Sequence, residues 1–185
     1  MTKPQTILSM RERYRTEAVP ALIRRFGYSS SMAVPRVGKV VVNVGVGRLR
    51  DDKQLEAVRR ALELITGQRP AARPARQAIA AFKTRRGLTV GYRVTLRGRR
   101  MWDFLLRLVG AAIPRQRDFR GIAAESFDGR GNLTMGFREH IVFPEMIGED
   151  VPFIFGLEVT VVTSAKRREE GLALLKALGF PIQDA

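Results

Sequence analysis

Hydrophobic residues recur along this chain at two different spacings, and the spacing separates expected helices from expected strands. Apolar residues three or four positions apart predict helices over 5–27, 51–67, 99–112 and 166–178. The clearest of them, 51–67, begins with the capping pair Asp51 and Asp52 and ends at Gly67. Its apolar stripe consists of Leu55, Val58, Leu62 and Ile65. We therefore expect four amphipathic helices, each burying one side.

Alternation of apolar and polar residues with a period of two predicts three strands. They cover 36–47, 88–96 and 157–163, where β-branched residues are frequent. Pro70 and Pro74 fall between the second helix and the second strand, so we expect a short strand there that enters a long, flexible, exposed loop, 71–87. The range 115–150 has no sustained period and is expected to be irregular, with a turn-rich hairpin or loop at 127–132.

These elements predict an α+β fold, namely a mainly antiparallel sheet with the helices packed on one face. The other face of the sheet and the long loop would remain free. A chain of 185 residues can bury a core of its own without metal ions or disulfides, so we expect one domain over 1–185. No internal repeat or low-complexity linker divides the sequence.

Polar residues occupy one side of each of the first two strands. In the first strand Lys39 and Asn43 share a side, and a run of valines faces the other way. In the second strand Arg93, Thr95 and Arg97 share a side, opposite apolar residues. An amide, a hydroxyl and cations on one sheet surface can bind a sugar-phosphate backbone. An ordinary solvated sheet face has a similar pattern, so the charge of the surrounding chain must decide between the two.

Positive charge is concentrated in one part of the chain. Between Arg69 and Arg120, thirteen Arg and one Lys stand against two acidic residues, which gives +12 of the formal net charge of +15. A polyanion would offset this self-repulsion, and the planar guanidinium pairs with phosphate through two hydrogen bonds. We therefore predict that the free sheet face and the 71–87 loop bind nucleic acid. The basic residues of the loop are Arg73, Arg76, Lys83, Arg85 and Arg86. The alternative is a mobile tip without a partner.

Several classes of function lack their characteristic residues. The chain has no Cys, which excludes disulfides, thiolate zinc sites and a Cys nucleophile and suits a reducing cytosol. No apolar run is long enough to cross a membrane, and the first residues have no hydrophobic signal core. We therefore expect a cytoplasmic location and no membrane partner. Gly45 and Gly47 follow a strand, but Arg50 stands where a dinucleotide-binding motif needs its third glycine.

His140 is the one histidine and the main candidate for catalysis. It lies beside Glu139, but without clustered carboxylates a lone histidine is expected to be structural. Asp128-Gly-Arg-Gly predicts a turn, because the alternating ligands of a calcium loop are missing. We therefore expect no catalysis, no cofactor and no metal ion. Two alternatives stay open: a basic RNA-processing enzyme using His140 with Glu139, and a nonspecific nucleic-acid-binding protein that compacts DNA.

Several segments, in order along the chain, resemble ribosomal protein five of the bacterial large subunit. They are Leu62–Gln68 with the basic loop that follows, Val94–Gly98, Pro114–Gly121, Ser126–Asn132 and Ile141–Glu145. The likeness covers essentially the whole chain. It implies a structural constituent of the large ribosomal subunit that binds 5S rRNA in the central protuberance. It also implies contacts with 23S rRNA, peptidyl-site tRNA and neighbouring central-protuberance proteins, and a bridge to protein thirteen of the small-subunit head.

The resemblance also implies roles for individual residues. The 5S rRNA surface would use Lys39, Asn43, Gln68 and Thr95, three of which the alternation argument had already placed together. The tip of the 71–87 loop would contact tRNA, and the 115–150 region would form the bridge. One departure concerns Arg73–Ala78, where relatives have a Thr-Lys-Ala-Lys/Arg-Lys-Ser pattern. Gln77 therefore replaces a cation, and two hydroxyls are missing.

Overall fold

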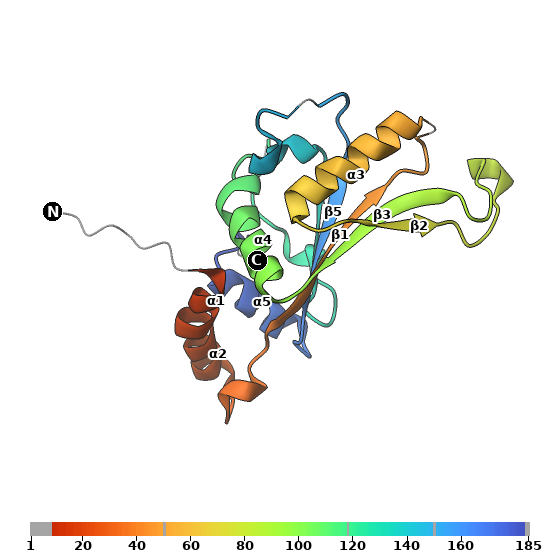
Figure 1. Ribbon diagram of the computed structural model, residues 1–185. Helices are drawn as coiled ribbons and strands as arrows, with labels where there is room; N and C mark the ends of the chain where they lie inside the picture. Colours follow the sequence, from red (N-terminus) through yellow and green to blue (C-terminus); the bar gives the residue numbers. More distant parts are fainter. Residues whose placement is uncertain (1–8, 50, 118, 150, 184–185) are drawn as a thin grey trace.

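The segment richest in valine forms the centre of the sheet. Strand β1 (Val37–Gly45) lies between β3 (Thr89–Leu96) and β5 (Leu157–Thr163), and all neighbouring strands are antiparallel. The computed structural model describes residues 9–49, 51–117, 119–149 and 151–183 (Figure 1). Two shorter strands, β2 (Ala71–Pro74) and β4 (Leu133–Phe137), form the edges, so the order is β2-β3-β1-β5-β4. The expected antiparallel α+β fold is therefore confirmed.

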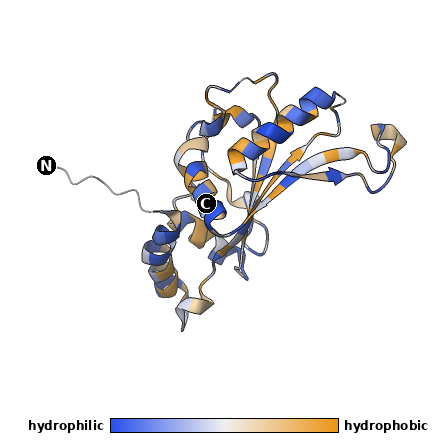
Figure 2. Cartoon of the chain, in the orientation of Figure 1, coloured by the Kyte–Doolittle hydropathy of each residue, from blue (hydrophilic) through white to orange (hydrophobic). Residues whose placement is uncertain are grey.

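The helices pack along one side of this sheet (Figure 1). The first helical segment runs through α1 (Met10–Arg13), a π-helical turn (Tyr14–Ala18) and α2 (Val19–Phe26). It is followed by α3 (Asp52–Thr66), by α4 (Gly98–Arg107) with a π-helical turn over Leu108–Ala112, and by α5 (Arg168–Ala177). Each helix carries hydrophobic and hydrophilic positions, as an element with one buried side requires (Figure 2). The four expected helical segments are confirmed.

The ends of the helices follow the signals in the sequence. The Asp51 side chain accepts a hydrogen bond from the backbone N–H of Lys53 at 3.0 Å and caps α3. Gly67 ends the same helix at φ 65°, a left-handed conformation that glycine adopts without steric cost. The expected start of the first helix at residue 5 lies outside the described residues. Within them, Ser9 caps α1 and forms a capping box with Glu12.

The core lies between the helices and one face of the sheet. Alternate residues of β1, beginning with Val40 and Val42, are fully buried there, as are Leu62 of α3, Leu105 of α4 and Leu174 of α5. The polar residues of β1 are consequently on the opposite face. This burial pattern agrees with the alternation read from the sequence.

Strand β4 corrects the expectation that 115–150 is irregular throughout. Leu133, Met135 and Phe137 are buried, and Thr134 and Gly136 between them are exposed, so the segment does alternate. It is only five residues long and contains a glycine and a methionine, which weaken the strand signal in the sequence. Pairing with β5 supplies the backbone hydrogen bonds that define it as a strand.

A tight turn precedes β4, as the sequence predicts for 127–132. The Asp128 carboxylate accepts hydrogen bonds from the backbone N–H groups of Arg130 and Asn132 and from the Asn132 amide, at 2.7–2.9 Å. Asn132 in turn accepts a hydrogen bond from the N–H of Thr163 at 2.9 Å. The turn is therefore closed by its own side chains and fastened to the end of β5.

Candidate nucleic-acid interface

The sheet face opposite the helices brings polar side chains from several strands into one row. Asn43 of β1 is paired with Arg93 of β3 on one side and with Glu158 of β5 on the other. Side chains at directly paired positions lie about 4.5–5.5 Å apart at Cβ. A guanidinium, an amide and a carboxylate thus follow one another across the centre of the sheet, from β3 through β1 to β5.

A second row carries mostly hydroxyls. Thr95 of β3 and Thr160 of β5 both pair with Val41 of β1, and Thr134 of β4 pairs with Thr160. The hydroxyls of Thr134 and Thr160 are 3.3 Å apart. Thr134 was missed in the sequence because β4 itself was missed. The alternation of buried Leu133, Met135 and Phe137 is the signal that could have revealed it.

The predicted residues Lys39 and Arg97 extend this face at its margin. Lys39 is half-buried and pairs with Val162, and Arg97 is exposed where β3 passes into α4. Asn43, Arg93 and Thr95 lie on the same surface. Five of the six residues predicted to bind 5S rRNA are therefore on this surface or beside it. We call this surface the polar sheet face; it comprises Lys39, Asn43, Arg93, Thr95, Arg97, Thr134, Glu158 and Thr160.

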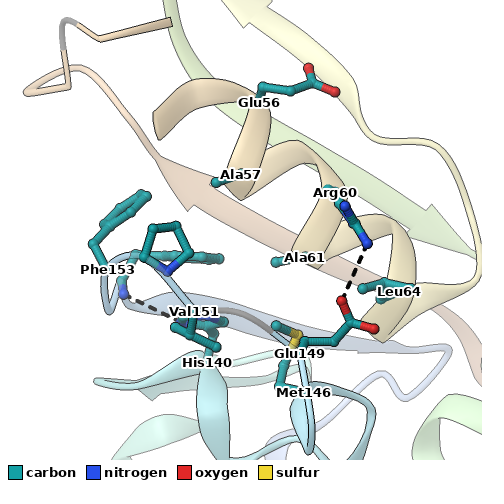
Figure 3. Close-up of a pocket in the computed structure, with 12 residues that line it drawn as sticks. Glu56, Ala57, Arg60, Ala61, Leu64, His140, Met146, Glu149, Val151 and Phe153 are labelled. Carbon is teal, nitrogen blue, oxygen red and sulfur yellow. Dashed lines mark hydrogen bonds and ion pairs between the residues drawn. The ribbon is translucent and has the colours of Figure 1, made fainter. Parts of the chain in front are cut away.

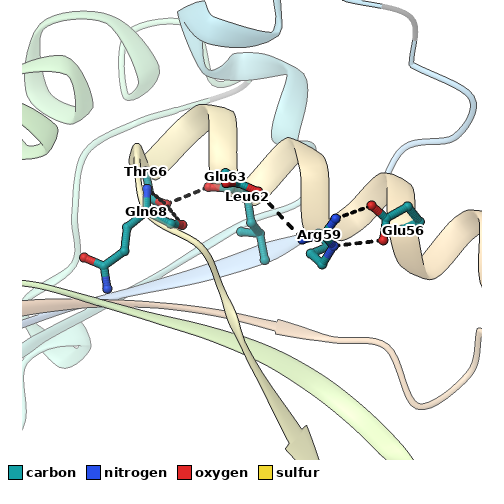
Figure 4. Close-up of polar contacts among 6 residues, drawn as sticks. All are labelled: Glu56, Arg59, Leu62, Glu63, Thr66 and Gln68. Carbon is teal, nitrogen blue, oxygen red and sulfur yellow. Dashed lines mark hydrogen bonds and ion pairs between the residues drawn. The ribbon is translucent and has the colours of Figure 1, made fainter.

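Gln68, the sixth predicted residue, reaches the edge of β3 from the end of α3. Its side-chain amide donates to the Thr95 carbonyl at 3.3 Å, and its backbone N–H donates to the Thr66 hydroxyl oxygen at 3.3 Å (Figure 4). Thr66 is itself buried and donates to Leu62 at 2.7 Å. The helix end therefore holds Gln68 against the strand that carries Thr95.

Arg93 has an incompletely satisfied guanidinium. The Nε atom is buried and makes no hydrogen bond within the described residues. A buried N–H of a charged group is costly to leave unpaired, and this nitrogen can reach an acceptor only if the side chain moves. No other residue of the polar sheet face has a buried side-chain nitrogen or oxygen in that condition.

The 71–87 loop begins with β2, as the short strand expected there, and the rest of it forms a hairpin tip that projects away from the helices (Figure 1). All five of its predicted basic residues are exposed or partly exposed. At the tip, Ile79 and Thr84 exchange backbone hydrogen bonds of 3.0 and 3.1 Å, and Lys83 adopts a left-handed conformation with φ 49°. Phe82 is 72% exposed beside these cations. The hairpin thus presents charge and one aromatic ring together.

Other kinds of site find little support in the described parts of the chain. His140 is 1% exposed and stacks on Phe155, and no group of three or more metal-ligating side chains occurs among the described residues. Within the same residues, no helix has the length and apolar character to cross a bilayer. The structural role expected for His140 is consistent with its burial.

Comparisons with known proteins agree on one family. The family model described as ribosomal protein L5 matches residues 30–85, and the model for the C-terminus of the same ribosomal family matches residues 89–182. The large ribosomal subunit protein uL5 of Roseiflexus sp. (strain RS-1) is 51% identical over 176 residues, covering 95% of this chain and 98% of that protein. The chain belongs to the ribosomal L5 family. The corresponding proteins of Halothermothrix orenii (strain H 168) and Streptococcus thermophilus (strain LMD-9) are 51% and 47% identical, and each covers at least 92% of this chain and 96% of its own length.

As a member of the L5 family, the chain is a ribosomal protein of the large subunit and not an enzyme. This confirms the family predicted from the motifs and removes the RNA-processing enzyme from consideration. The two matched ranges do not form separate halves of the molecule. Strand β3, from the second range, lies between β1 and β2, from the first.

Proposed function

We propose that this L5-family protein binds 5S rRNA through the polar sheet face and attaches it to the central protuberance. The observation that carries the proposal is the register that places Asn43 directly beside Arg93, with Thr95 on the same face two residues further along β3. The half-buried positions of all three support the proposal, because such side chains have restricted conformations and remain accessible at one side.

Each residue of the face has a chemical role in this proposal. Lys39, Arg93 and Arg97 pair with phosphates. Asn43 offers a donor and an acceptor together, and Thr95 meets a ribose hydroxyl, which distinguishes RNA from DNA. Gln68 holds the edge of β3 and extends the contact. Glu158 lies next to Asn43 and would repel a phosphate there, so the RNA backbone is expected to cross the β1–β3 side of the face.

The exposed hairpin suits a second RNA. We infer that Arg73, Arg76, Lys83, Arg85 and Arg86 contact peptidyl-site tRNA, because the hairpin projects clear of the helices and carries charge on a narrow element (Figure 1). The region 115–150 would bridge to protein thirteen of the small-subunit head. Contacts with 23S rRNA and with neighbouring proteins of the central protuberance complete the proposed attachment, within cytoplasmic ribosomes.

The decisive experiment compares 5S rRNA binding by the wild type and variants at fixed salt. Asn43→Ala and Thr95→Ala are each expected to weaken binding about 5- to 100-fold, since each removes one or two hydrogen bonds worth about 1–3 kcal/mol. Filter binding measures the affinity, and circular dichroism checks that the variants are folded. Normal affinity in both variants would contradict the assignment of the sheet face.

The matched control removes two positive charges from the hairpin, whereas the first two variants remove neutral side chains from the sheet face. The double variant Arg85→Ala with Arg86→Ala should retain affinity for isolated 5S rRNA within the small loss caused by its lower net charge. A large loss would mean that the hairpin, not the sheet face, holds 5S rRNA. Competition with duplex DNA tests the remaining alternative, since a nonspecific nucleic-acid-binding protein would bind the duplex about as tightly as 5S rRNA.

A further inference from the structure

The last turn of α3 leads to the polar sheet face but carries no cation of its own. Gln68, which donates to the Thr95 carbonyl, follows this turn directly (Figure 4). The final carbonyls of a helix lack partners within it and carry a partial negative charge, which a nearby cation stabilises. No basic residue stands in the last turn of α3. The cation comes from another helix, because Arg107 of α4 donates from a terminal nitrogen to the Ile65 carbonyl at 3.1 Å.

The guanidinium of Arg107 is held in turn by a carboxylate. Its Nε lies 2.6 Å from Oε1 of Glu145, which belongs to the 3₁₀ turn Pro144–Met146. This Nε and both oxygens of Glu145 are buried, and their contact is ionic and not an aligned hydrogen bond. Within the described residues, the Glu145 side chain has no second ion pair and no hydrogen bond. Removal of either partner would therefore leave buried polar atoms of the other uncompensated.

Apolar packing alone does not fix α3 against the segment 139–156. A hollow of about 270 Å³ separates the two, beside Ala57, Ala61 and Leu64 of the helix (Figure 3). Side chains that line such a hollow lack contacts on one side, so the helix has room to shift there. The Arg60–Glu149 pair spans the hollow at 3.4 Å, but it is largely exposed and contributes little. The contact of Arg107 with Glu145 is the buried polar connection between this segment and the end of α3.

We propose that Arg107 and Glu145 are positioning residues for 5S rRNA, which act through the end of α3 without touching the RNA. Glu145 orients the guanidinium, and the guanidinium fixes the Ile65 carbonyl. The last turn then holds Gln68 against β3. The inference rests on the proposed function and adds two residues outside the polar sheet face that contribute to its affinity for RNA.

The sign of one charge change separates positioning from simple electrostatics. Glu145→Gln raises the formal net charge from +15 to +16, so long-range attraction alone predicts tighter binding of 5S rRNA. Loss of positioning predicts the opposite, namely about threefold weaker binding, which corresponds to one weakened hydrogen bond. Filter binding at fixed salt measures the affinity.

Arg107→Lys tests the same contact at constant charge. Lysine has one terminal nitrogen in place of the planar fork, so it cannot hold the Ile65 carbonyl and the Glu145 carboxylate in the same way. This variant should also bind 5S rRNA about threefold more weakly, since it loses a hydrogen bond of the same kind. Wild-type or tighter binding by both Glu145→Gln and Arg107→Lys would overturn the proposal. Circular dichroism establishes which variants fold, and if only one of them does, that variant decides.

Asp103→Asn is the matched control, because it also removes one carboxylate. Asp103 lies one turn before Arg107 in α4 and pairs with Arg99 at 3.6 Å, where both side chains are exposed. Its removal changes the net charge by the same amount as Glu145→Gln and leaves the end of α3 untouched. Binding of 5S rRNA should therefore be unchanged or slightly tighter. A threefold loss in this control would attribute the effect of Glu145→Gln to charge and overturn the proposal.

Gln68→Ala tests the route by which the pair acts. It should weaken binding about threefold to tenfold, and Glu145→Gln added to it should cause no further loss. A further threefold loss in the double variant would refute the route through Gln68. Normal binding by Gln68→Ala, Asn43→Ala and Thr95→Ala would contradict the proposed function and this inference with it. A loss in those three variants, with normal binding at positions 107 and 145, would contradict this inference alone.

Amide hydrogen exchange gives a readout that does not depend on RNA. Glu145→Gln should speed exchange at Gly67 and Gln68, whose N–H groups close the end of α3, and leave Val58 in the middle of the helix unchanged. Equal exchange at Gly67 and Gln68 in the variant and the wild type would show that Glu145 does not hold the helix end.

Discussion

The imidazole of His140 lies flat against the Phe155 ring, with 3.9 Å between the ring centroids and 11° between their planes. Burial lowers the pKa of His140 below its ordinary value of 6.5, and the contact with the Phe155 backbone opposes that shift only in part. The ring is therefore neutral in the folded protein at neutral pH. Buried in this way, the His140 ring contributes to packing and would be a poor proton acceptor for catalysis.

The lowered pKa makes stability depend on pH in a definite direction. In the unfolded chain His140 binds a proton near pH 6.5, whereas the folded protein binds it only at lower pH. The free energy of unfolding should therefore fall as the pH drops below about 6.5. His140→Gln removes this contribution, so the difference in stability between pH 7.5 and 5.5 should be smaller in the variant. Urea unfolding at both pH values measures it, and identical pH dependence would refute the effect of burial.

At the scale of elements, the turn before β4 and the helix α5 meet backbone to backbone. A Cβ atom added to Gly131 would lie 2.8 Å from the Cα of Gly171, and one added to Gly171 would overlap the Gly131 carbonyl. Gly171 is buried inside α5, where glycine normally costs about 1 kcal/mol relative to alanine. The close approach explains why glycine suits this helical position.

Gly171→Ala should therefore destabilise the protein, against the usual effect of helix propensity. Overpacking of this kind costs about 1–3 kcal/mol, because the obstructing atoms belong to backbone and cannot rotate away. Gly110→Ala is the control, since no atom lies within 4 Å of the added Cβ and the change should be neutral or stabilising by up to about 1 kcal/mol. Thermal and urea unfolding compare the two variants. A Gly171→Ala protein as stable as the wild type would mean that the turn moves freely against α5.

Most elements could be predicted because their signals are local. Asp51 and Gly67 mark the ends of α3, and the valines of β1 alternate with polar residues. Strand β4 could not be recognised, since a five-residue edge strand depends on pairing with β5 and the sequence shows only its weak alternation. The contact between Gly131 and Gly171 could not be predicted either, because the two glycines are 40 positions apart and no sequence pattern links them.

For the candidate site, the sequence predicts the side of each strand but not the register between strands. Alternation places Asn43 and Arg93 on polar sides, but only the pairing of β1 with β3 makes them direct neighbours. Similarly, the contact of Gln68 with the Thr95 carbonyl crosses 27 positions and requires the helix to end beside β3. The hollow between α3 and the segment 139–156 was not foreseen, because its lining comes from positions far apart in the sequence (Figure 3).

At the scale of the whole molecule, the interleaved sheet predicts that the chain folds as one unit. Strand β3 lies between β2 and β1, so a cut after Gly87 separates the central strand β1 from both of its partners. We propose that the fragments 1–87 and 88–185 are each unfolded alone. Far-ultraviolet circular dichroism measures the secondary structure of each fragment, and the spread of NMR chemical shifts reports whether it is folded. Mixing the fragments should restore structure. A folded fragment of either kind would show that the chain contains two units.

The unequal distribution of charge has a consequence for how the protein approaches its partners. The range 69–120 holds a balance of +12, whereas the segment 139–156 holds only acidic charges, so the molecule has a permanent electric dipole moment. In the field of a folded RNA, that dipole experiences a torque that turns the cationic elements forward before any atoms touch. Productive encounters during ribosome assembly are thereby enriched over random collisions, and raising the ionic strength removes this advantage.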